Sequence, residues 1–126
     1  MTIEIERVPI TVVEPLRCEA MLEGITFADR TKYYAAYKDG KLIGFCGAIW
    51  FKKSVEFKNA FVVPECRGIG VFRMMFLHRV RICKALGIKI INAFCTPAGA
   101  KQYRKLGAVQ RGNPTKNGLI RMRIQL

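Results

Sequence analysis

The stretch VVPECRGIG, residues 62–70, joins an apolar run at 55–63 to a run with helical spacing at 71–86. The first run is rich in β-branched and aromatic residues, which predicts a strand. Gly68 and Gly70 give the backbone the freedom to turn between the two elements. A strand that enters a helix through such a loop aims several backbone N–H groups and the positive end of the helix dipole at one point, which favours an anion such as phosphate. A plain strand-to-helix turn is the alternative that this stretch alone leaves open.

Upstream of the loop, the sequence predicts a strand, a helix and a hairpin. Thr11 is the expected cap of the helix, because apolar residues recur at helical spacing after it. Asp39 and Gly40 form a favoured two-residue hairpin turn between two apolar runs. The predicted elements are a strand at 2–8, a helix at 11–24 and strands at 33–38, 41–51 and 55–63. The last three make an antiparallel meander.

Downstream of the loop, helices and strands alternate. Gly87 and Gly107 are the expected stops of two helices, and Thr96 with Pro97 is a favourable start for the second. The predicted elements are helices at 71–86 and 97–106 and strands at 88–95, 108–111 and 119–126. The fold class is therefore α/β, with a mixed, largely antiparallel sheet flanked by helices in the order β-α-β-β-β-α-β-α-β-β.

Length and composition indicate one globular unit. The chain has 126 residues, of which 51% are hydrophobic and 25% charged, as in soluble domains. No apolar run approaches the roughly 20 residues that a membrane span needs, so no membrane partner is expected. The N-terminus alternates and carries acids, unlike a signal peptide.

The net charge of +13 is unevenly distributed along the chain. Residues 1–63 carry nine Lys and Arg against eight Asp and Glu, whereas residues 64–126 carry thirteen against one. Such an imbalance favours an anionic partner, such as a phosphate-rich cofactor or nucleic acid. A solubility charge on solvated faces is the alternative.

The cysteines and the histidine predict no metal site. The five cysteines are odd in number, none has C-x2-C spacing, and His78 has no second ligand at a suitable distance in sequence. We expect a reduced, cytoplasmic protein without metal, in which most cysteines are small core residues.

Two motifs resemble the GCN5-related N-acetyltransferases (GNAT superfamily). The family's acetyl-CoA loop, Arg/Gln-x-x-Gly-x-Gly/Ala after a strand ending in Val-x-Pro, is matched by Arg67 and Gly70, while Phe72 stands at the last position. The run TPAGAKQYRKLG at 96–107 resembles the family's Asn-Pro-x-Ala-x-x-x-Tyr-x-Lys-Leu-Gly-Phe helix. The resemblance covers about residues 31–126 and implies that residues 1–126 form a single GNAT-like acyltransferase domain.

The resemblance implies acetyl-CoA as the acyl-donor cosubstrate. Backbone N–H groups of the loop would hold the CoA pyrophosphate, and the end of the preceding strand would pair with the pantetheine arm. The implied cofactor-binding residues are Phe61, Val62, Val63, Arg67, Gly68, Ile69, Gly70, Val71, Phe72 and Thr96.

The resemblance also implies direct transfer to an amine. Tyr103 matches the tyrosine that protonates the departing thiolate, and a well-placed phenol can do so. Glu56 is the candidate base, because an amine must lose a proton before it attacks; Asn59 is the alternative, as a residue that orients a water molecule. Tyr103 packed on the sheet and Glu56 as a solvated strand residue remain open structural alternatives.

The acceptor amine is not specified by the sequence. The basic half favours a nucleic-acid-linked acceptor such as aminoacyl-tRNA, or DNA, and a homodimer is compatible with the fold. The alternative function is a catalytically inactive GNAT-like module that binds nucleic acid or protein, which Phe72 in place of Gly or Ala would favour.

Overall fold

The computed structural model describes residues 2–126, apart from the side chain of Asn59, and its core is a seven-stranded sheet. The strand order is β1-β2-β3-β4-β5-β7-β6, and only the β4–β5 pair is parallel. The elements are β1 (Ile3–Val8), α1 (Ile10–Val13), the 3₁₀ turn η1 (Glu14–Leu16), α2 (Arg17–Leu22), β2 (Lys32–Lys38), β3 (Lys41–Trp50), β4 (Ser54–Val62), the 3₁₀ turn η2 (Pro64–Cys66), α3 (Val71–Leu86), β5 (Ile90–Cys95), α4 (Pro97–Lys105), β6 (Val109–Gln110) and β7 (Ile120–Gln125). The predicted α/β class, element order and largely antiparallel sheet are confirmed.

The first helix differs from the prediction at its start. It begins at Ile10 after Pro9, and no side chain caps it, so the prediction that Thr11 is the cap was wrong. Pro15 lies in the 3₁₀ turn that divides this helix into α1 and α2. Proline lacks the N–H that a continuous α-helix requires, which accounts for the break. The Thr96 cap is confirmed, because its Oγ1 accepts a hydrogen bond from the Gly99 N–H at 3.2 Å.

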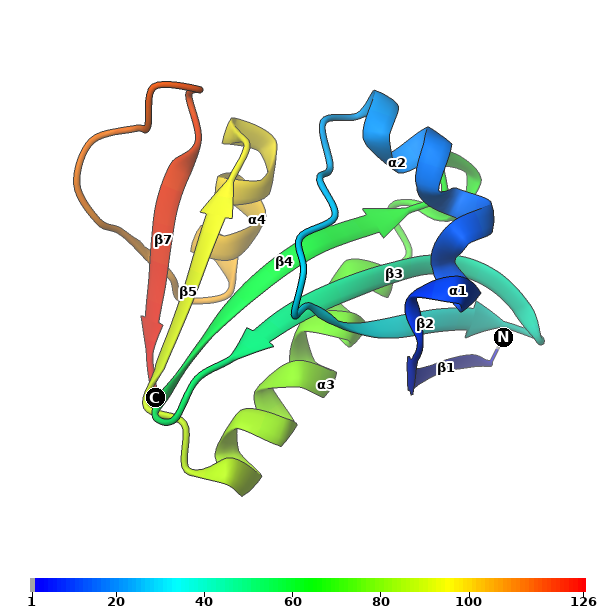
Figure 1. The fold of residues 1–126 in the computed structure, drawn as a ribbon, viewed down its shortest axis with the longest axis horizontal. Coiled ribbons are helices and arrows are strands. Elements are labelled where there is room, and N and C mark those ends of the chain that lie inside the picture. Colours follow the sequence, from blue (N-terminus) through cyan, green and yellow to red (C-terminus); the bar gives the residue numbers. More distant parts are fainter. Residues whose placement is uncertain (1) are drawn as a thin grey trace.

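Helices cover the sheet on both faces, as Figure 1 shows. Helices α1 and α2 lie in front of β2–β4, whereas α4 lies behind β5. Phe76 of α3 and Tyr103 of α4 are in edge-to-face contact, so these two helices share the rear face. The opposite face of β5 and β7 carries no helix in this view. Buried apolar residues lie on both sides of the sheet, among them Val13 and Ala20 of the front helices and Met75 of α3.

The sheet opens between its two parallel strands. Strands β4 and β5 pair only from Ser54 to Phe57 and from Ile90 to Ala93, and they then diverge (Figure 1). The β3–β4 register shifts at the same level, because Phe45 pairs with Phe61 but Gly47 pairs with Lys58. This bulge bends β4 away from β5. We call the resulting opening the β4–β5 fork.

Two further findings concern the described helices and the cysteines. No helix in the described part of the chain is both long and apolar enough to cross a membrane. All five thiols are free, and four of them are buried, as predicted for small core residues.

Candidate functional site

The loop after β4 presents free backbone N–H groups at the mouth of the β4–β5 fork. Gly68 and Gly70 have φ values of +83° and +90°, which other residues rarely adopt. The N–H of Arg67 donates to the Pro64 carbonyl at 3.2 Å, so the unpaired N–H groups begin at Gly68 rather than at Arg67. The first bond of α3 runs from the Met74 N–H to the Gly70 carbonyl. The N–H groups before Met74 are therefore available to an anion.

The Arg67 side chain fixes this loop from within. Its Nε donates to the Val62 carbonyl at 2.7 Å, and its Nη2 donates to both carboxylate oxygens of Glu23 at 2.7 and 2.8 Å. The guanidinium also lies over the Phe61 ring at 5.5 Å. Arg67 thus connects the loop with the end of β4 and with the residue after α2.

A groove of about 530 Å³ lies between the loop, the end of β4 and α4. Eight of the ten predicted cofactor-binding residues line it: Phe61, Val62, Arg67, Gly68, Gly70, Val71, Phe72 and Thr96. Val63 is buried beside the groove and Ile69 is exposed outside it. Sequence reasoning missed Ala98, Gln102 and Lys105, although their helical spacing after Thr96 places them on one face of α4.

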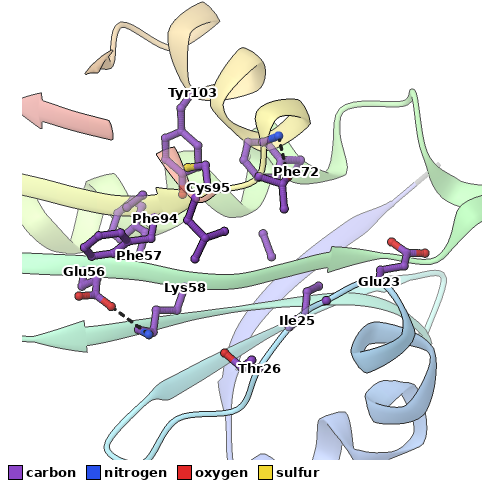
Figure 2. A pocket seen from close by; sticks show the side chains of 16 residues that line it. Glu23, Ile25, Thr26, Glu56, Phe57, Lys58, Phe72, Phe94, Cys95 and Tyr103 are labelled. Carbon is purple, nitrogen blue, oxygen red and sulfur yellow. Dashed lines mark hydrogen bonds and ion pairs between the residues drawn. The ribbon is translucent and has the colours of Figure 1, made fainter. Parts of the chain in front are cut away.

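A second cavity of about 270 Å³ adjoins the groove and contains both predicted catalytic residues, Tyr103 and Glu56. The two spaces share Phe72, Thr96 and Gly99 among their lining residues. Figure 2 shows Glu56 on one side of β4 and Tyr103 on the other. The second cavity therefore extends through the fork.

Tyr103 is held by aromatic neighbours. Its ring meets Phe72 and Phe76 edge-on, each with a centroid distance of 5.7 Å. Burial raises the pKa of Tyr103 to about 12, while the charge of Arg79 counteracts part of this rise. Tyr103 is therefore a neutral proton donor at physiological pH. Phe72, at the position where the resemblance implies Gly or Ala, packs on this tyrosine.

Glu56 lies on the front face of β4, opposite to Phe57. Its Oε2 is 3.0 Å from the Lys58 Nζ, and both side chains are partly exposed (Figure 2). A partly exposed carboxylate in the cavity can accept a proton. Asn59 lies on the same strand, but the prediction about its side chain falls outside the described residues.

The donor set fits an acyl-CoA. The groove combines unpaired N–H groups suited to phosphate with the edge of β4 beyond Phe57, which no neighbouring strand covers and which is suited to amides. No group of three or more His, Cys, Asp or Glu suited to a metal ion occurs among the described residues.

Known proteins share this fold. The sequence model of the Acetyltransferase (GNAT) family matches residues 2–108. The PaiA N-acetyltransferase of Thermoplasma acidophilum, solved with coenzyme A, superposes with a TM-score of 0.83 at 19% identity over 100% of both chains.

Two further solved structures have the same fold. The IAA acetyltransferase of Bacillus cereus has a TM-score of 0.78 and 19% identity, over 99% of this chain and 100% of its own. The ribosomal-protein-S18-alanine N-acetyltransferase of Escherichia coli has a TM-score of 0.76 and 17% identity, over 98% and 94%. None of the curated proteins matches the chain by sequence.

Proposed function

The chain belongs to the Acetyltransferase (GNAT) family, and from that premise we propose that it transfers an acetyl group from acetyl-CoA to a primary amine. The observation that carries this proposal is the junction of two cavities at the fork. One cavity offers an anion cradle and a free strand edge, and the other contains an acid and a carboxylate. When bound, acetyl-CoA supplies the thioester whose carbonyl carbon accepts the amine.

The groove residues hold and orient the donor. The N–H groups of Gly68, Ile69 and Gly70 and the first turn of α3 bind the pyrophosphate, because unpaired N–H groups and the helix dipole both favour negative charge. The Val62 edge hydrogen-bonds the pantetheine amides as a neighbouring strand would. Arg67 fixes the position of the loop relative to this edge through its bonds to Val62 and Glu23.

Two side chains move protons during the transfer. The amine nitrogen forms a bond to the acetyl carbon while the carbon–sulfur bond breaks, and the leaving sulfur takes the Tyr103 hydroxyl proton. Glu56 accepts the proton that the amine loses. Glu56 releases its proton to solvent and Tyr103 regains one before the next turnover, so both groups return to their starting states.

Thermal unfolding with acetyl-CoA tests this function first. A ligand that binds only the folded state raises Tm in a saturable manner. Ala98→Trp fills the groove from α4 and should abolish the shift, whereas Lys101→Trp on the exposed side of the same helix should retain it. ATP at the same concentration shows how much of any shift is general anion binding to a basic protein. No shift beyond that with ATP would contradict the proposal.

A second candidate concerns the acceptor, which we propose is attached to a nucleic acid. The uncovered front face of β5 and β7, here called the β5–β7 face, consists of Asn92, Phe94, Arg121 and Arg123. Arg121 lies over the Phe94 ring at 5.3 Å, and Arg123 Nε donates to Asn92 Oδ1 at 3.0 Å. Asn92 is the cross-strand partner of Glu56, so this face leads to the second cavity.

Charge supports this candidate as well. Among the described residues, Arg67 is the only cation after Glu65 that forms an ion pair. The two arginines of the β5–β7 face are therefore free to contact phosphates, and the half-exposed Phe94 can stack on a base.

The salt dependence of RNA binding in matched variants distinguishes docking on the β5–β7 face from attraction by the overall positive charge. A short single-stranded RNA should bind with an affinity that falls steeply as salt rises, and a double variant Arg121→Ala/Arg123→Ala should reduce the logarithmic slope by about two. Arg81→Ala/Lys84→Ala on the exposed face of α3 removes the same charge and should leave the slope unchanged. If the affinity for RNA does not change with salt, the acceptor is not attached to a nucleic acid. If the slope falls equally in both double variants, the β5–β7 face is not the binding surface.

A further inference from the structure

Arg79 is a buried charge that neither the fold nor the proposed groove explains. It lies in the middle of α3 and is the only charged residue that is fully buried, with 0% exposure, among the described residues. No carboxylate of the described chain forms an ion pair with it. A charge in the core without a counter-ion carries a large desolvation cost.

The hydrogen bonds of Arg79 satisfy only part of its guanidinium. Nη1 donates to the Gly47 carbonyl at 2.9 Å, and Nε makes a long contact of 3.4 Å with the Met75 carbonyl. The guanidinium carbon lies 4.1 Å from the centre of the Phe57 ring. Nη2 is buried and has no hydrogen-bond partner. An unpaired donor of this kind costs about 1–3 kcal/mol, so packing alone gives no reason for an arginine here.

The unpaired donor belongs to the same cluster as the predicted acid. Phe57, beneath the guanidinium, meets Phe76 edge-on at 5.8 Å, and Phe76 in turn meets Tyr103 at 5.7 Å. Burial raises the pKa of the Tyr103 hydroxyl, and the nearby positive charge of Arg79 lowers it. The other titratable groups that face Tyr103 are the thiols of Cys95 on β5 and Cys46 on β3, and both raise it.

We propose that Arg79 is a positioning residue whose buried guanidinium stabilises the Tyr103 phenolate after the phenol has given its proton to the leaving sulfur. This inference rests on the proposed function, because it needs Tyr103 as the acid. The proton moves from Tyr103 Oη to the sulfur, the carbon–sulfur electron pair stays on sulfur, and the negative charge passes to the phenolate. Nη2 is the donor available to bind that charge.

The opposing effects explain why a buried tyrosine needs this neighbour. Burial alone makes proton transfer from a phenol to a thiolate unfavourable, because a thiol is the stronger acid. A cation already fixed in the core lowers this cost without any movement during the reaction. Lysine or a neutral side chain at position 79 lacks the planar group that binds the Gly47 carbonyl through one nitrogen and keeps a second, unpaired nitrogen donor beside it.

A substrate-free titration tests the proposal. The protein is labelled with 3,5-difluorotyrosine, which brings phenol titration into a range where the protein stays folded, and the 19F signal of Tyr103 is assigned by its loss in Tyr103→Phe. Arg79→Met should raise the titration midpoint of Tyr103 by about one pH unit or more, while the signal of Tyr37 stays in place. Arg79→Lys should give a smaller rise. Unchanged midpoints in both variants would overturn the proposal.

The 19F signal of Tyr34 reports loss of the fold directly, because the Tyr34 ring contacts the His78 ring on α3 at a centroid distance of 5.6 Å. Methionine is also of similar length, and an apolar replacement of a buried charge is often neutral or stabilising. If Arg79→Met does not fold, Arg79→Lys and Arg79→Gln give the same comparison.

A kinetic measurement distinguishes failure of this proposal from failure of the proposed function. Hydroxylamine is a small acceptor that is uncharged at neutral pH and needs no base. Arg79→Met should slow its acetylation about tenfold in the parent chain but not in Tyr103→Phe. Equal slowing in both backgrounds would show a merely structural role. A Tyr103→Phe variant with full activity would instead refute the acid of the proposed function, whatever the titration of Arg79→Met shows.

Discussion

Arg67 holds both carboxylate oxygens of Glu23, 44 positions away in the sequence, at 2.7 and 2.8 Å. The same guanidinium also binds the carbonyl of Val62. One side chain therefore sets the relative position of the glycine loop, the open strand edge and the end of the first helical segment. Both charged groups are partly exposed, so the pair contributes little to overall stability but determines the shape of the groove.

Arg67→Lys keeps the charge and removes this geometry, because an ammonium cannot bind the carboxylate bidentately and reach Val62 as well. We expect the Kd for acetyl-CoA to rise about fivefold, equal to roughly 1 kcal/mol, with little change in Tm. Isothermal titration calorimetry measures the affinity. The matched control is Arg17→Lys, since Arg17 pairs with Glu14 on an exposed surface outside the groove. Equal loss of affinity in both variants would contradict a specific role for Arg67.

Gly44 lets β3 approach the end of β4. A Cβ at this position would lie 2.6 Å from the Phe61 carbonyl oxygen and 3.3 Å from the Val62 Cα. Gly44→Ala should destabilise the protein by roughly 1–3 kcal/mol in denaturant unfolding, because backbone atoms must move apart. The displaced residues line the groove, so binding of acetyl-CoA should weaken as well. A variant with unchanged stability would mean that β4 shifts without cost.

The raised pKa of Tyr103 predicts that the folded protein loses stability in alkaline solution. Its pKa is about 12 in the folded protein against 10 in an unfolded chain. Between these values the unfolded chain binds fewer protons, so the free energy of unfolding falls as pH rises. Tyr103→Phe removes this contribution and should lose less stability between about pH 9 and 11, by roughly 1 kcal/mol, than the parent. A Tyr103→Phe variant that loses as much stability as the parent over this pH range would contradict the assignment.

If Glu56 is the base, the effect of its loss on the rate of transfer should depend on the basicity of the acceptor amine. Methylamine is protonated at neutral pH and must lose a proton before it attacks, whereas hydroxylamine is already neutral. Glu56→Gln should therefore slow transfer to methylamine by about a hundredfold and leave transfer to hydroxylamine nearly unchanged. Lys58→Met is the companion variant, because it removes the ion-pair partner and keeps the carboxylate. Equal slowing with both amines would assign Glu56 to positioning rather than to proton transfer.

Local patterns predicted most of the fold. The extent of α3 followed directly from the glycines that flank it, and α4 from Thr96, Pro97 and its glycine stop. Thr11 failed as a cap because the N-cap position is Pro9, two residues earlier. A capping side chain is only one of several ways to begin a helix, so the type of residue alone could not decide between them.

Contacts between distant segments could not be predicted in the same way. Nothing near Arg67 in the sequence indicates that its partner is Glu23, because the ion pair exists only after α2 and the loop have packed together. The sequence does place position 79 on the buried side of α3, since it lies four residues from both Met75 and Cys83. Its charge argued against burial, and only the packed structure shows it inside the core.

The fork divides the sheet into two leaves, one formed by β1–β4 and the other by β5–β7. Among the described strands, only the pairing of Ser54 to Phe57 with Ile90 to Ala93 joins the two leaves, and no strand pairing joins them at the open end of the fork. A molecule held by both leaves acts as a crosslink between them. Slowed amide exchange along β5 and β7 is then a sign of occupancy that requires no knowledge of the acceptor.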